Sequence, residues 1–196
     1  MGSEMCIRDR QKVLPYELVE DLINNNDTFA VIRCQCRYIG ELSGNPCEIA
    51  PSDMGCFVTG IGAKSLTNMG LAKPLTKEEA IEYLIKTEKA GLVHITSNSK
   101  GGEHLMFICN CCPCHCGALL PAKKFGFKTV ISSNFRPKIN NELCVKCQTC
   151  IKKCPMNALT QNNEELISLN SDLCIGCGIC ASNCPKNAIK MVREEK

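Results

Sequence analysis

The sequence has no tryptophan, and aromatic residues make up only 5% of its 196 residues, which leaves few large rings for a core. It has no run of about 18 apolar residues and no apolar segment of the signal-peptide type at its start, so neither a membrane span nor secretion is supported. The formal net charge of +3 is too mild to suggest a nucleic-acid partner. These absences predict a cytoplasmic chain with no membrane span and no bound nucleic acid.

Cysteine is the residue in excess, with 18 copies in the chain. In a secreted protein such a number would indicate disulfides, but clustered thiols in a reducing compartment are more often metal ligands. The cysteines therefore direct the search for function toward metal chemistry.

The first ten residues are interpreted as a sequencing artefact. The run Met5–Asp9 is what the mosaic-end sequence of a transposon-based sequencing adapter would encode. Such segments are excluded from fold reasoning. Cys6 is therefore not counted among the ligands, and the native chain is expected to be represented from residue 11 onward.

Two cysteine runs near the C-terminal end share one spacing at an offset of 30 residues. They are Cys144-x2-Cys147-x2-Cys150-x3-Cys154-Pro155 and Cys174-x2-Cys177-x2-Cys180-x3-Cys184-Pro185. Bacterial ferredoxins hold [4Fe–4S] clusters with this spacing. Zinc motifs pair two CxxC knuckles and do not end in x3-C-P, so zinc and disulfide alternatives are disfavoured.

The stretch from about residue 137 to residue 196 resembles the two-cluster bacterial ferredoxin family. The resemblance implies two [4Fe–4S] clusters, each taking three thiolates from one run and the fourth from the other. One cluster is expected on Cys144, Cys147, Cys150 and Cys184. The other is expected on Cys174, Cys177, Cys180 and Cys154.

Residues 11–132 show mixed helix and strand signals. Apolar spacing predicts a helix over 14–26, and a capping box at Thr76 predicts a second helix that ends at Gly91. Strands are predicted at 28–32, 92–96 and 104–108, the last two joined by a polar turn at 98–102. We expect Cys34 and Cys36 to open a loop, and residues 55–65 to form a glycine-rich loop.

This part of the chain contains nine further candidate metal ligands. They are Cys34, Cys36, Cys47, Cys56, Cys109, Cys111, Cys112, Cys114 and Cys116. Five of them fall within eight residues, a density that cannot pair internally as disulfides without strain. At least one further iron–sulfur cluster is predicted here on ligands from both groups, with zinc as the alternative.

The order of helix, strand, CxC-Arg, spaced cysteines, GLVH and CNCC resembles a module attached to ferredoxin domains in anaerobic bacteria and archaea. In that module the run is closer to CNCC-x-CCC. His115 stands where a cysteine is common, so we do not count it among the ligands.

The predicted fold is α+β, with a small cysteine-rich α/β domain over residues 11–132 and a pseudo-twofold ferredoxin domain over residues 133–196. The predicted function is that of an iron–sulfur electron-transfer protein, a ferredoxin or a ferredoxin-like subunit of a redox complex, with redox proteins as partners. The alternative is a module that senses redox state or carries metal on its N-terminal cysteines. No nucleophile–base pair points to an enzyme.

Overall fold

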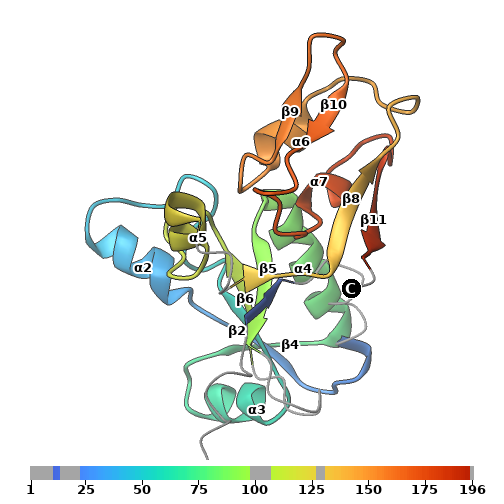
Figure 1. Ribbon diagram of the computed structural model, residues 1–196. Helices are drawn as coiled ribbons and strands as arrows, with labels where there is room; N and C mark the ends of the chain where they lie inside the picture. Colours follow the sequence, from blue (N-terminus) through green and yellow to red (C-terminus); the bar gives the residue numbers. More distant parts are fainter. Residues whose placement is uncertain (1–10, 14–22, 98–106, 127–130, 195–196) are drawn as a thin grey trace, which may run out of the picture.

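The computed structural model describes residues 11–13, 23–97, 107–126 and 131–194. Helices and strands are mixed in two lobes, a larger one around a seven-stranded sheet and a smaller one formed by the C-terminal segment (Figure 1). The predicted α+β class is confirmed.

The sheet of the larger lobe has the strand order β4-β2-β3-β6-β5-β1-β7. Its strands are β1 (Gln11–Val13), β2 (Phe29–Ile32), β3 (Cys56–Thr59), β4 (Lys73–Leu75), β5 (Val93–Ser97), β6 (Phe107–Cys111) and β7 (Ile131–Ser132). Neighbours are antiparallel except β1 and β7, which run parallel. The strands predicted at 28–32 and 92–96 are confirmed as β2 and β5.

Two predicted features fall wholly or mostly outside the described residues. The turn at 98–102 is one, and the helix over 14–26 is the other. The strand predicted at 104–108 corresponds to β6, which begins at Phe107 among the described residues and continues to Cys111. The first two cysteines of the dense run therefore lie on a strand.

The helices of the larger lobe are α2 (Gln35–Leu42), α3 (Gly60–Asn68), α4 (Lys77–Ala90) and α5 (Leu119–Phe125). The predicted capping box of α4 is confirmed. Glu79 N–H donates to Thr76 Oγ1 over 3.2 Å, and Thr76 N–H donates to Glu79 Oε2 over 2.8 Å. Gly91 ends the helix with φ +96°.

The expectation that Cys34 and Cys36 open a loop was wrong. Cys34 is the N-cap of α2, Cys36 lies in the first turn, and the chain leaves the helix only at Ser43. Turn-forming residues such as Gly40 favoured a loop in the sequence, but tertiary contacts override that preference. Arg37 anchors the helix in the interior, where it has no exposed surface.

The expectation of a glycine-rich loop over 55–65 was also wrong, because this stretch contains β3 and most of α3. Gly55 is required for close approach: a Cβ there would collide with Ile32 O and lie 2.8 Å from Cys34 N. Gly60 begins α3 with φ +61°. The glycines permit tight strand packing and a sharp strand-to-helix turn.

The smaller lobe pairs its elements across the 30-residue offset. Its elements are β8 (Phe135–Ile139), α6 (Thr149–Lys153), β9 (Leu159–Gln161), β10 (Ile167–Leu169), α7 (Ile179–Ser182) and β11 (Ile189–Arg193). Antiparallel pairs form between β8 and β11 and between β9 and β10. β8 begins at Phe135, close to the domain boundary predicted between residues 132 and 133.

The two lobes meet through α4, β5 and the segment after β6. Asn183 Nδ2 donates to Glu88 O over 3.2 Å, and Lys153 Nζ reaches Lys89 O. A shared buried cluster contains Val93 and Leu119 from the larger lobe and Ile179 from the smaller. Within the described part of the chain, no helix combines the length and apolarity needed to cross a membrane.

Candidate metal centres

The smaller lobe contains two cavities, each lined by four cysteines. The first, the outer cavity, is lined by Cys144, Cys147, Cys150 and Cys184. The second, the inner cavity, is lined by Cys154, Cys174, Cys177 and Cys180. The two cavities are of similar size. In each cavity, three cysteines come from one sequence run and the fourth comes from the other run.

Backbone N–H groups point at the sulfur atoms in the same way in both halves of the lobe. Lys146 N–H donates to Cys144 Sγ and Gly176 N–H to Cys174 Sγ, both over 3.4 Å. Ala158 and Ala188 donate in the same manner to Cys154 and Cys184, over 3.2 and 3.3 Å. Donors aimed at sulfur stabilise negative charge on a cluster and raise its potential.

Both motifs need the left-handed backbone conformation at two positions. Gly176 and Gly178 adopt it in the second motif, and Lys146 and Gln148 adopt it in the first. Gly176 also lacks room for a side chain, because a Cβ would collide with Phe135 O. The first motif faces open space at this point and tolerates larger residues.

The two cavities differ in their distance from solvent. Cys147 of the outer cavity is exposed, and a hydrogen bond from the Thr149 hydroxyl lowers its pKa. Its counterpart in the inner cavity, Cys177, is only partly exposed, and burial raises its pKa. The exposed Lys146 near the outer cavity is paired with Glu165 at 2.5 Å, which offsets its charge. One ligand of the outer cavity is therefore open to solvent, whereas its counterpart in the inner cavity is more buried.

Five cysteines of the larger lobe form a continuous series of thiol contacts, which we call the thiol row. It runs Cys34, Cys56, Cys109, Cys111, Cys116. Cys34 caps α2, Cys56 begins β3, and Cys109 and Cys111 project from one face of β6 because strand side chains alternate. Cys36 lies beside this row, close to Cys116 and Cys34.

Hydrogen bonds between neighbouring sulfurs decide which thiols of the row lose a proton most readily. A hydrogen bond from Cys111 lowers the pKa of Cys109 to about 4, while contact with Cys109 raises the pKa of Cys56 to about 12. Cys109 and Cys116 thus favour deprotonation, whereas the other three thiols of the row resist it. The thiolate is the form in which cysteine binds a metal or cluster, so these sulfurs are candidate ligands.

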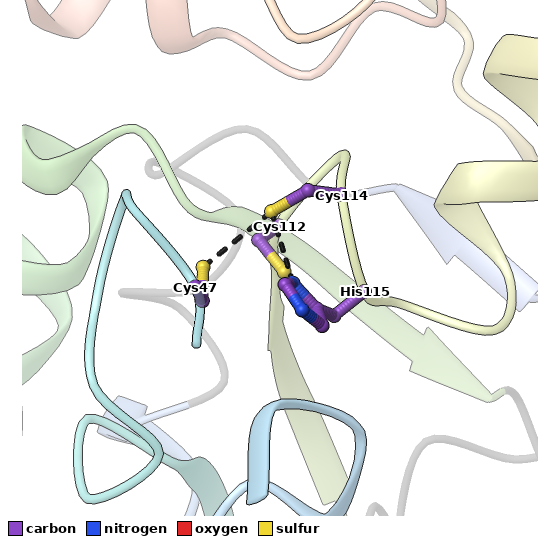
Figure 2. Close-up of side chains that lie close together, drawn as sticks. All are labelled: Cys47, Cys112, Cys114 and His115. Atoms are coloured by element: carbon purple, nitrogen blue, oxygen red, sulfur yellow. Dashed lines mark hydrogen bonds between the residues drawn. The ribbon is translucent and has the colours of Figure 1, made fainter. Parts of the chain in front are cut away.

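The remaining N-terminal ligands gather at a separate place, which we call the Cys47 tetrad. It consists of Cys47, Cys112, Cys114 and His115, whose ligand atoms all lie within 4.8 Å of one another. Figure 2 shows Cys47, from the loop after α2, facing the three side chains of the loop after β6. The nine cysteines predicted as ligands therefore fall into two groups, and the second includes a histidine that the sequence reasoning excluded.

Arg37 lies between the two groups with no exposed surface. Its Nη1 donates to Asn110 O over 2.8 Å and its Nε to Pro51 O over 3.2 Å, and its Nη2 contacts Met54 O. Burial works against its charge, but the Cys34 and Cys112 thiols outweigh burial and raise the pKa of Arg37. A permanent cation is thus held against sulfurs of both groups.

We expect the Arg37→Met substitution to lower the free energy of unfolding by about 3 kcal/mol, since each hydrogen bond made by a charged group contributes about 1.5–3 kcal/mol. Arg37→Lys keeps the charge but loses the planar fork, so its effect should be smaller. Urea unfolding of the metal-loaded full chain measures both. An Arg37→Met midpoint equal to that of the unsubstituted protein would contradict this role.

His94 is a buried packing residue of β5. It is 1% exposed, and its Nδ1 hydrogen-bonds Asn110 Oδ1 over 2.8 Å. Asn110 Nδ2 in turn donates to Gly55 O over 2.8 Å. Burial lowers the pKa of His94 to about 4, so it stays neutral and ties β5 to β6 and the start of β3.

Comparison with known proteins identifies the nature of the smaller lobe. Residues 137–191 match a protein family described as the 4Fe-4S dicluster domain. This segment is therefore a ferredoxin-type iron–sulfur domain, and its two cysteine-lined cavities suit such a domain. The comparison with curated proteins found no match.

Proposed function

We propose that this protein carries single electrons between redox partners through two [4Fe–4S] clusters in its smaller lobe. One cluster would be held by Cys144, Cys147, Cys150 and Cys184. The other would be held by Cys154, Cys174, Cys177 and Cys180. The observation that carries the proposal is the pair of similar cavities, each lined by four cysteines drawn from both sequence runs.

We further propose a third iron–sulfur cluster on the thiol row. The centre of the row is formed by Cys56, Cys109 and Cys111. Cys34, the N-cap of α2, would be a further ligand. Zinc would also bind such thiolates, but zinc has no redox chemistry. A domain attached to an iron–sulfur relay gains from another redox centre, so iron fits the electron-transfer function better.

The position of the inner cavity supports an order for the relay. Cys111 and Cys116 of the thiol row belong to the same buried cluster as Ile175 and Ile179, and Cys174 of the inner cavity packs against it. Electron transfer weakens steeply with distance, so adjacent centres exchange fastest. The electrons would pass from the thiol-row cluster to the inner cluster and then to the outer cluster.

The surface around the outer cavity supports its role as the point of exchange with a redox partner. Leu143 and Val145 are both 53% exposed there, next to the exposed Cys147. The exposed Lys186 lines the same cavity. Apolar contact beside a positive charge suits transient docking of an acidic redox protein.

Substitution of Cys34 or Cys111 by alanine should remove one redox species and leave the two clusters of the smaller lobe intact. Low-temperature EPR during a redox titration of the anaerobically purified full chain measures the number of species and their potentials. Cys6→Ala is the matched control, because Cys6 is not counted among the ligands and its replacement should leave the iron signals unchanged.

Unchanged EPR signals in both Cys34→Ala and Cys111→Ala would contradict a cluster on the thiol row. If electron transfer to an artificial acceptor persisted while a specific response to oxidant disappeared, the thiol row would belong to a redox sensor. Loss of transfer through the whole protein on removal of the smaller lobe's iron is the result expected of an electron carrier.

A further inference from the structure

We propose that the Cys47 tetrad is a closed, mononuclear zinc site, separate from the iron–sulfur relay. This assignment goes beyond the proposed electron transfer, because the site would bind a metal that carries no electrons. It also gives a ligand role to His115, which was not counted among the ligands in the sequence analysis.

The spacing of the ligand atoms fits one metal ion. Zn–S bonds of about 2.3 Å in a tetrahedron place two sulfurs about 3.8 Å apart. The sulfur atoms of Cys47 and Cys114 lie 3.5 Å apart, and all four ligand atoms of the tetrad lie within 4.8 Å of one another. Three cysteines and one histidine are a common ligand set of structural zinc.

The histidine is oriented as a metal ligand. His115 Nε2 lies 2.8 Å from Asn45 O, a bond in which only the nitrogen can be the donor. That bond leaves Nδ1 without a proton and directed at the thiols, 3.2 Å from Cys114 Sγ (Figure 2). Metal-bound histidines typically donate their other N–H to a backbone carbonyl in this way. The ring is thus held in the tautomer that zinc requires.

A glycine in α2 makes room for this ring. Gly40 is buried inside the helix, where glycine costs about 1 kcal/mol relative to alanine. A Cβ at this position would collide with His115 Cδ2 and lie 2.6 Å from His115 Nε2. The space occupied by the imidazole therefore explains a residue that is otherwise unfavourable in a helix.

The charge around the site suits a zinc ion with three thiolates. Such a group carries a net charge of about −1, since each ligating thiol loses its proton on binding. Arg37 hydrogen-bonds to Cys112 and lies near Cys47, so it balances that charge in the interior. Four protein ligands leave no open position, which is typical of a structural rather than a catalytic site.

Zinc would tie together two segments that also supply the thiol row. Cys47 lies on the loop that leads from α2 to Cys56, the first residue of β3. His115 directly precedes Cys116 on the loop after β6. The site would therefore fix the approach of these loops without taking part in electron transfer.

The test measures zinc and iron per chain in the anaerobically purified full-length protein. We expect about one zinc, lost to below about a tenth in Cys47→Ser and His115→Ala. His115→Cys should retain zinc, because four cysteines also form a structural site. Gly40→Ala, which changes no ligand, should weaken zinc binding about 10- to 100-fold, the usual effect of disturbing a residue that supports a ligand.

Cobalt substitution supplies an independent readout. Co²⁺ bound by the unsubstituted protein should show the intense visible bands of tetrahedral thiolate coordination, and these should be absent in His115→Ala and changed in His115→Cys. Cys111→Ala serves as the reciprocal control: it should lose iron from the thiol row and keep its zinc.

Two results would overturn the zinc site. One is zinc content and cobalt bands that are unchanged in both Cys47→Ser and His115→Ala. The other is loss of iron in place of zinc from these variants, which would assign the tetrad to a cluster. The proposed electron relay is tested separately. It would be contradicted by unchanged EPR signals in Cys34→Ala and Cys111→Ala, whatever the zinc content of these variants.

Discussion

Replacing Cys150 and Cys184 together with alanine should remove one [4Fe–4S] cluster, whereas replacing Cys150 and Cys154 together should remove two. Cys150 and Cys184 line the outer cavity, while Cys154 lines the inner one. If the fourth ligands cross between the sequence runs, the first pair of changes damages a single cluster twice. The second pair, although confined to one run, damages both clusters.

EPR spin integration of the dithionite-reduced full chain distinguishes the two outcomes. The Cys150→Ala single variant is the control and should lack one [4Fe–4S]⁺ spin. Adding Cys184→Ala should not lower the integrated spin further. Adding Cys154→Ala should lower it by one more spin per chain. The reverse pattern would show that each run holds its own cluster, and the crossed assignment would then be wrong.

The ferredoxin-type lobe could be predicted from the sequence because its chemistry is local. Each motif spans eleven residues, and its spacing alone is diagnostic. The same holds for α4, whose start depends on Thr76 and Glu79 and whose end depends on Gly91. Signals within one or two helical turns are readable without knowledge of the tertiary structure.

The larger lobe could be predicted less well, because its glycines make room for residues that are distant in the sequence. Gly40 makes room for the ring of His115, and Gly55 accommodates the backbone of Ile32. Both glycines suggested loops, and both lie at the close packing of regular elements. Nothing adjacent to either residue in the sequence carries this information.

The division of the N-terminal cysteines was also beyond sequence reasoning. Cys111 and Cys112 are adjacent, yet Cys111 joins the thiol row and Cys112 joins the Cys47 tetrad. Consecutive residues at the end of a strand point to opposite sides, so the alternation of β6 separates them. That alternation could have been applied to the CNCC run, had β6 been extended to Cys111.

Removing the iron should unfold the smaller lobe while the core of the larger lobe persists. The smaller lobe has helices of only four and five residues and a core cluster that includes Cys150 and Cys180. Helices this short are not stable alone, and domains of this size commonly need a metal to stabilise them. Without clusters, both cavities lose their contents and the thiolates face one another.

The larger lobe has a core that is independent of metal. Phe29, Phe57 and Leu84 belong to a buried cluster without cysteines, and the rings of Phe29 and Phe57 lie 5.8 Å apart. The 14-residue helix α4, capped at both ends, covers this cluster. Its stability depends on apolar burial, which a chelator does not change.

Hydrogen exchange of the full chain, before and after oxidative removal of iron with ferricyanide and EDTA, measures both halves of this prediction. The opening free energies of amides in β8, β11, α6 and α7 should fall to near zero. Amides in β2, β3 and the first turns of α4 should stay protected. The last turn of α4 is an internal control, because Asn183 of the smaller lobe contacts Glu88 O there. The amides of this turn should lose part of their protection when the smaller lobe unfolds. Persistent protection across residues 137–191 after complete iron loss would show that the lobe folds without its clusters, and loss of protection in β2 and β3 would show that the larger lobe depends on metal as well.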